Sequence, residues 1–337
     1  MSTTPSTQPG AATGTDAEPT PEGAAAPTGV NATPGATTGV RPATSPPGTG
    51  VRPPYTGPTT GTQGVRQPVY GLGMIVSLGV ALAVFVLAII AIGDPNSSDI
   101  PLAQTTNLIY WFLAALIIAA AGIGAQYAER TAAQAAAAVG RARPESAMAT
   151  AWAVPVVATL AAILLVATYH NRIMLVVGPL IAFLGNAGAL LSRDLLDDAG
   201  DSAHRTAIAI HTFVIHAVAF LALSAVYLNK LSSWAAAPLV GIVAGLLVLE
   251  TLERGTAPKQ TRVLYAILGG AVVAEAMIAL NWWQTHGWTG GAVLLVCFYL
   301  AAGVLLAATQ RSALRTRDLL EFGLVGLVAF AVLAATA

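Results

Sequence analysis

Charged side chains are scarce in this chain of 337 residues, because only 9% of them are Asp, Glu, Lys or Arg, whereas soluble domains contain about 25%. The sixteen acidic and sixteen basic residues cancel, so no basic excess is available to attract nucleic acid. We therefore expect no nucleic-acid partner. A hydrophobic fraction of 55% and a mean hydropathy of +0.69 are typical of an integral membrane protein.

Cysteine and the short motifs of common enzymes are also missing. The single cysteine, Cys297, lies in an apolar run, which excludes an internal disulfide framework and a thiolate metal site. The chain has no GxxxxGK[ST], GxGxxG, HExxH or GxSxG motif, so ATPase subunits, dinucleotide enzymes, zinc proteases and serine hydrolases lack their minimal signatures. Only His211 and His216 lie fully within an apolar run, and they share one run, which disfavours haem held between two helices. We expect no cofactor and no metal.

Residues 1–68 contain most of the prolines, together with many Thr, Gly and Ala residues and no sustained apolar run. Such a segment cannot bury enough apolar surface to offset the entropy lost on ordering, so it is predicted to be a disordered cytoplasmic tail. Its GVRP-like repeat favours a passive tail, and the alternative is a contact point for a protein partner. No signal peptide is recognisable at Met1, so we expect the first span to direct insertion.

Residues 69–337 are predicted to form an all-α, polytopic transmembrane bundle. A hydrocarbon core of about 30 Å requires about 20 apolar residues per helix, and the apolar runs have that length. Nine spans are expected, of which the sixth and the ninth are short. Their ranges are 69–93, 107–127, 148–168, 173–192, 206–228, 235–252, 263–283, 289–309 and 319–336.

The positions of Lys and Arg predict the orientation, because short cytoplasmic loops retain them. With the N-terminus in the cytoplasm, fourteen of the sixteen basic residues lie in inner segments, and only Arg172 and Lys230 lie in outer loops. Every loop alternates as the rule requires. The interpretation is a multi-pass protein of a bacterial cytoplasmic membrane, with the N-terminus inside and the C-terminus outside, whose first partner is the lipid bilayer.

Ionisable residues at bilayer depth indicate function, since they cost several kcal/mol. Glu275 is twelve residues into the seventh span, which places it about 18 Å from the inner edge. His216 is ten residues into the fifth span, at nearly the same depth. A Glu275–His216 pair could relay a proton or bind a cation. The alternative is a neutral hydrogen bond that joins two spans, or no contact.

Three further groups of polar residues are candidates. His211 is expected to bond a polar group at its own depth, with Asn186 as the obvious partner, although close packing is the simpler explanation for Asn186. Glu250 and Glu253 end the sixth span and are expected to reach headgroup water. The inner loop after Arg193 carries oxygen ligands that suit Mg²⁺ or Ca²⁺, but a solvated cap on two helices is favoured over an ion site. Its members are Asp194, Asp197, Asp198, Asp201 and His204.

Three classes of function remain. The favoured hypothesis is a secondary transporter or permease-like protein that moves an unknown small solute or ion, because midplane ionisable residues occur without an energy-coupling domain. The first alternative is a non-catalytic scaffold or assembly subunit. The second is a membrane-embedded enzyme that acts on a lipid carrier, for which only the Asp194–His204 loop offers paired acids.

Overall fold

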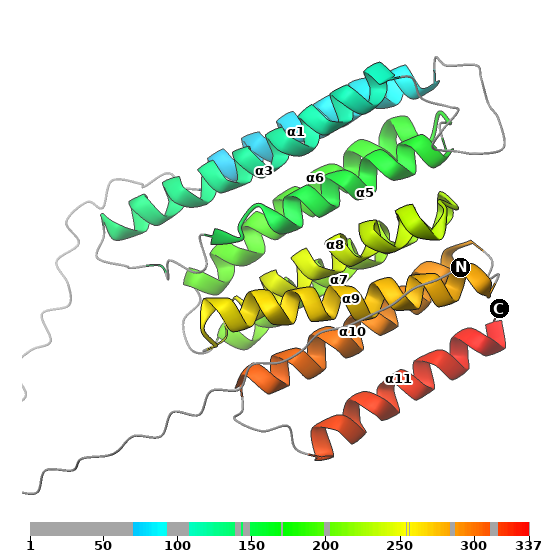
Figure 1. The fold of residues 1–337 in the computed structure, drawn as a ribbon. Coiled ribbons are helices and arrows are strands. Elements are labelled where there is room, and N and C mark those ends of the chain that lie inside the picture. Colours follow the sequence, from blue (N-terminus) through cyan, green and yellow to red (C-terminus); the bar gives the residue numbers. More distant parts are fainter. Residues whose placement is uncertain are drawn as a thin grey trace, which may run out of the picture. The chain divides into compact units, whose positions relative to one another are not determined.

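The computed structural model describes residues 70–92, 108–138, 143, 149–169, 171–198, 203–253, 255, 257–283, 287–310 and 316–336. Within these ranges the chain is helical and contains no strand (Figure 1). The expected N-terminal tail lies outside the described residues. The helices are α1 (Tyr70–Ile92), α3 (Leu108–Ala137), α5 (Ala153–Tyr169), α6 (Met174–Asp198), α7 (His204–Leu228), α8 (Ser233–Leu252), α9 (Lys259–Trp282), α10 (Trp288–Gln310) and α11 (Thr316–Thr336).

The chain is a multi-pass membrane protein. Seven of the described helices are long and apolar enough to cross a bilayer, and α5 and the apolar part of α11, Leu319–Leu333, are shorter. Large apolar side chains cover the outside of the helices, for example Phe213 at 73% exposed and Ile123 at 71%. Water would not tolerate so much contiguous apolar surface, whereas lipid does. Each expected span matches one helix, and α3 continues past its apolar run to Ala137, as expected from the Ala-rich stretch that follows this run and precedes Pro144.

Helix α5 is the central element of the bundle. Thirteen of its seventeen residues are buried, and it contacts α1, α3, α6, α7 and α8. A helix that is apolar on all sides is expected to be surrounded by other helices, which also explains why α5 need not match the thickness of the bilayer. Small residues allow the close approach, since a side chain at Gly185 of α6 would touch the Cβ atom of Ala158.

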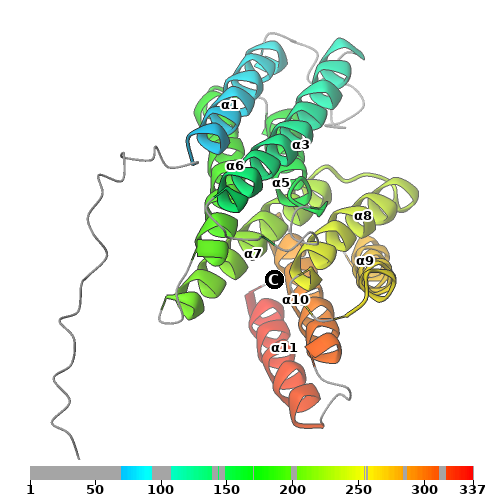
Figure 2. The same ribbon diagram turned by 90° about the vertical axis from the view of Figure 1, so that its left-hand side faces the viewer.

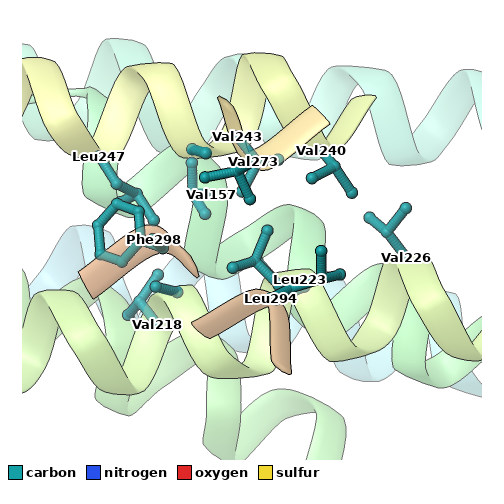
Figure 3. Packing of buried hydrophobic residues seen from close by; sticks show 14 of the residues in the cluster. Val157, Val218, Leu223, Val226, Val240, Val243, Leu247, Val273, Leu294 and Phe298 are labelled. Atoms are coloured by element: carbon teal, nitrogen blue, oxygen red, sulfur yellow. The ribbon is translucent and has the colours of Figure 1, made fainter. Parts of the chain in front are cut away.

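Two apolar cores lie on either side of α5. The first joins α1, α3, α5 and α6. The second joins α5 to α7, α8, α9 and α10. Figure 3 shows this second core, in which Val157, Leu223, Leu247, Val273 and Phe298 converge from five different helices. Helix α11 packs against α10 (Figure 2).

The closest helix pair is α8 with α9, which meet through glycines. Gly241 and Gly245 of α8 lie against Gly270 of α9, so that the two backbones touch. A Cβ atom at Gly270 would overlap the carbonyl oxygen of Gly241. Such small-residue contacts replace the hydrophobic driving force, which is absent between helices in lipid.

We predict that Gly270→Ala lowers the free energy of unfolding by about 1–3 kcal/mol, because the two backbones must separate. Gly79→Ala is the matched control, since no atom lies within 4 Å of the position of its Cβ atom and alanine favours a helix by about 1 kcal/mol over glycine. Thermal unfolding of both variants in detergent measures the difference. Equal stabilities would contradict the close packing of α8 and α9.

Candidate functional site

A buried guanidinium group occupies one end of the bundle. Arg193, in the second-last turn of α6, is 2% exposed, and its Nη1 atom donates to Oε1 of Glu250 in α8. Its Nη2 atom lies 3.5 Å from Oε2 of Glu253. Thr150, just before α5, donates from Oγ1 to the second oxygen of Glu250 at 2.6 Å. Three segments that are distant in sequence therefore meet at one carboxylate.

His211 of α7 completes this set of residues. Its Nδ1 atom and the Oγ atom of Ser192 are joined by a 2.9 Å hydrogen bond, and its Nε2 atom is 3.5 Å from Oε1 of Glu250. His211 is only 7% exposed. We call Arg193, Glu250, Glu253, His211 and Thr150 the Arg193 network.

The Arg193 network contains two carboxyl groups and one guanidinium group. Burial away from water, and then the neighbouring Glu250, raise the pKa of Glu253 from 4.5 to about 8, although Arg193 and Arg262 act in the opposite direction. Arg262 of α9 reaches the same place, where its Nη1 atom donates to the backbone oxygen of Glu253 at 2.6 Å. The two carboxyl groups of the network share the one guanidinium group of Arg193, so a proton or another cation can balance the second carboxylate.

A second buried ion cluster lies beside the first and is centred on Arg143. Its Nη1 atom is 3.1 Å from Glu129 of α3, its Nη2 atom is 3.0 Å from Asp194, and its Nε atom is 3.6 Å from Asp197. Burial opposes the charge of Arg143, but the three carboxylates prevail and raise its pKa above the ordinary value. Arg143 thus joins α3 to the last turns of α6.

Three members of the Arg193 network, His211, Glu250 and Glu253, line a cavity of about 600 Å³ between α7, α8 and α10. This volume is within the usual range for small-molecule sites. Three of the five histidines of the chain line the cavity, together with both glutamates of the network. Polar and apolar side chains both line the cavity. The lining residues are Leu196, His204, Ile208, His211, Thr212, Ile215, His216, Glu250, Thr251, Glu253, Gly255, Leu306 and Gln310.

Glu275 and His216, the expected midplane pair, do not meet. His216 lines the cavity from α7, donates from Nδ1 to the backbone oxygen of Thr212 in its own helix, and packs its ring against Phe298 and Tyr299 of α10. Glu275 is exposed on the opposite side of α9 from the core. Helices α8 and α10 contact both α7 and α9 and so lie between them, which explains why equal depth does not bring the two side chains together.

His211 and Asn186 are both buried, but the expected bond between them is absent from the described structure. Asn186 donates to Oγ1 of Thr159 at 3.0 Å and to the backbone oxygen of Ala182 at 2.7 Å, so it joins α5 to α6. His211 bonds Ser192 instead. Ser192 is six residues further along α6 than Asn186, which brings it about 9 Å closer to the end of the helix and to the depth of His211.

The acidic loop also differs from the expected solvated cap. Asp194 and Asp197 belong to α6, where Arg143 binds both, and their side chains are 12% and 7% exposed. His204 begins α7 and is exposed, whereas the side chain of Asp198 and the whole of Asp201 lie outside the described residues. Among the residues that the structure describes, no group of three His, Cys, Asp or Glu side chains is arranged to hold a metal ion.

Glu250 and Glu253 were not predicted as site residues. Both were expected to reach headgroup water, yet their side chains are 1% and 3% exposed. One signal was present in the sequence, since Glu250 and Glu253 are three residues apart and so share one face of α8. Arg193 follows the fourth predicted span at the same membrane edge at which the sixth span ends. This common depth is the signal for an ion pair between the two helices.

Comparison with known proteins identifies a family without an assigned activity. The model of a family described as "Protein of unknown function (DUF5656)" matches residues 86–336, which is more than half of the chain. The chain therefore belongs to this family. No curated protein and no solved structure shows detectable similarity to it.

We predict that Arg193→Leu lowers the free energy of unfolding by about 3–5 kcal/mol, because it leaves Glu250 buried without its cation. Adding Glu250→Leu to the same chain should restore most of this loss, since no buried charge of that pair remains. Thermal or denaturant unfolding in detergent measures both variants. A double variant that loses as much as the sum of the two single variants would contradict the ion pair.

We also predict a pH-dependent effect of Glu253→Gln. The folded protein holds the proton of Glu253 more tightly than the unfolded chain does, so this carboxyl group stabilises the fold below about pH 4.5 and loses that effect as the pH rises through about 8. Unfolding temperatures measured from pH 5 to pH 9 should show the variant gaining on the native chain as the pH rises. Glu321→Gln, on the exposed side of α11, is the control. A difference that does not change with pH would refute the assignment.

Proposed function

We propose that this member of the DUF5656 family is a secondary transporter or permease-like protein that binds a proton and a small cation in turn in the cavity between α7, α8 and α10. One observation carries the proposal. The cavity wall contains Glu250, Glu253 and His211, and a single guanidinium group, that of Arg193, contacts both carboxyl groups.

The chemistry of the wall favours competition between a proton and a cation. Arg193 neutralises one negative charge of the Glu250–Glu253 pair, and the second charge can be balanced either by a proton on Glu253 or by a bound cation. Both ligands use the same carboxyl oxygens, so binding of the cation expels the proton. Exchange of a cation for a proton at one site is the minimal requirement for coupled transport.

The location of the site also suits this function. The Arg193 network lies at the ends of α6 and α8 and near the start of α7, which the distribution of Lys and Arg assigns to the cytoplasmic side. Gly255 and Gln310 border the cavity at these same ends. We infer that the site is loaded from the cytoplasm and that the histidines further along α7, His211 and His216, line the path into the bundle.

The alternative functions have less support. An enzyme acting on a lipid carrier would need acidic side chains available near the headgroups, but Arg143 binds both Asp194 and Asp197. A scaffold or assembly subunit would need no polar cavity. The cavity, with three histidines and two glutamates in its lining, is more polar than passive helix packing requires.

Proton flux in proteoliposomes tests the proposal. Protein is reconstituted with a pH-sensitive dye inside the vesicles, and Na⁺, K⁺ or Li⁺ is added outside at fixed internal pH. We expect at least one cation to drive proton movement in the native protein. Glu250→Gln and Glu253→Gln should each reduce the rate about tenfold or more, because each removes a charged ligand worth about 1.5–3 kcal/mol.

Glu275→Gln serves as the matched control, since this glutamate lies on the exposed face of α9 and not in the cavity. Its flux should equal that of the native protein. Glu253→Gln is expected to be at least as stable as the native chain at neutral pH. A loss of flux in this variant is therefore not caused by unfolding. Absence of flux with all three cations, or equal losses in Glu275→Gln and Glu250→Gln, would overturn the proposal.

A further inference from the structure

A groove runs along the outside of α3, between this helix and the start of α5. Helix α3 packs beside α1 and α5 at the margin of the helices (Figure 2). The groove has a volume of about 710 Å³, within the range of about 300–1,000 Å³ that is usual for small-molecule sites. We call it the α3 groove. Its lining residues are Ala115, Ile118, Ala119, Gly122, Ile123, Gln126, Tyr127, Arg130, Trp152 and Val156.

The walls of the α3 groove are held in place by contacts within the chain. A Cβ atom at Gly122 would lie 2.9 Å from Cγ2 of Val156, so α3 and α5 are close at this level. Ala119 and Ala115 lie one and two turns before Gly122 and carry only methyl groups, which leaves room beside them. On the other side, Nε1 of Trp152 donates to a backbone oxygen at 3.1 Å. This bond fixes the orientation of the indole ring.

The α3 groove has the length of one leaflet of a bilayer. Its ends along α3, Ala115 and Arg130, are fifteen residues apart, which is about 22 Å of helix. Half of a bilayer, headgroups included, measures about 20–22 Å. From Ala115 to Ile123 the lining of α3 is apolar, and Tyr127 comes between this part and Arg130. The order of apolar, aromatic and cationic groups is that of an acyl chain, the membrane interface and a headgroup.

Arg130 brings a positive charge that the described part of the chain does not balance. Its side chain is exposed, and it has no hydrogen-bond or ion-pair partner among the described residues. The preceding residue, Glu129, is buried on the other side of α3, where Arg143 binds it at 3.1 Å. None of the described residues that line the α3 groove is acidic. The electrostatic complement of the groove is therefore an anion at headgroup depth.

We propose that the α3 groove binds one phospholipid whose headgroup carries a net negative charge. The phosphate pairs with the guanidinium group of Arg130, and an acyl chain occupies the apolar part between Ala115 and Ile123. A planar guanidinium group can donate two parallel hydrogen bonds to the oxygens of a phosphate, which fixes the headgroup in place. The groove shares no lining residue with the cavity between α7, α8 and α10, so this binding does not depend on the proposed transport function.

The charges at the groove also select among phospholipids. Phosphatidylcholine and phosphatidylethanolamine carry an ammonium group beside the phosphate. This second cation would lie close to Arg130, and no described acidic residue of the groove could bind it. A headgroup without the ammonium group, as in phosphatidylglycerol, avoids this repulsion. One guanidinium group then balances the one charge of the phosphodiester.

Native mass spectrometry of the full chain in detergent tests the selectivity. The protein is titrated with phosphatidylglycerol or with phosphatidylcholine of the same acyl chains, and lipids bound to the 34.2 kDa chain are counted. We expect the first phosphatidylglycerol to bind several times more tightly than phosphatidylcholine. Arg130→Gln should weaken this binding about fivefold or more and remove the preference, because one charged contact is lost. Arg317→Gln, which removes an exposed arginine from the first turn of α11, is the matched control.

A second pair of variants tests the place of the acyl chain. Ala119→Phe places a large side chain in the groove, whereas Ala120→Phe places the same side chain at almost the same depth but about 100° around the helix. Both alanines are exposed, and only Ala119 lines the groove. Ala119→Phe should weaken the first phosphatidylglycerol several-fold, and Ala120→Phe should leave it unchanged. The comparison separates the contribution of the chain from that of the headgroup.

Several results would overturn the proposal. They are equal affinities for the two lipids, equal effects of Arg130→Gln and Arg317→Gln, and equal effects of Ala119→Phe and Ala120→Phe. A protein that appears as a dimer without bound lipid would also overturn it, since a second copy would then occupy the groove. Thermal unfolding of each variant in detergent without lipid identifies any general loss of fold, and binding is compared only among folded variants.

Discussion

The buried guanidinium of Arg193 is the constraint on which one end of the bundle depends. A cation at 2% exposure cannot exist among apolar helices without carboxylates within reach. Glu250 meets this requirement from α8, while Thr150 and His211 satisfy the remaining oxygen positions from the start of α5 and from α7. Four helices are thereby held in one register at this end, and the cavity beside them takes its polar wall from the same atoms.

The arrangement of charge differs between the two ion clusters. Arg143 lies among three carboxylates that belong to α3 and α6, and it joins these two helices. Arg193 faces the cavity through its glutamates. The first cluster therefore has a structural role, whereas the second combines a structural role with groups that a ligand can reach. This division explains how a chain with few charges can concentrate so many of them in one place.

Hydropathy predicted the helices of the bundle closely, because the length of an apolar run reflects the thickness of the hydrocarbon layer. It could not predict the site. Depth follows from position along a span, but the direction in which a side chain points depends on the neighbours of its helix. Glu275 has the depth of a functional residue and faces outward, whereas Glu250 has the depth of a headgroup contact and faces the core. Only the neighbours of α8 and α9 separate the two cases.

The same limit explains why the candidate pairing of Asn186 with His211 does not form among the described residues. Asn186 and His211 belong to neighbouring helices, yet Thr159 and Ser192 lie nearer to them in depth and direction. The sequence contains these hydroxyl groups without distinguishing them from the many other Ser and Thr residues of the chain. Residue type and spacing therefore suffice for the class of fold, and the contacts between spans require the three-dimensional arrangement.

The position of α5 has a consequence for how the protein is made. Ribosomes synthesise the chain from the N-terminus to the C-terminus. Helices α1, α3 and α5 therefore enter the membrane before α7 and α8, which later cover the other side of α5. Until then, the small-residue surface of a seventeen-residue helix faces lipid or an insertion factor. Vectorial synthesis therefore completes the core around α1 first, and α5 is the template on which the later helices, with the cavity between them, are assembled.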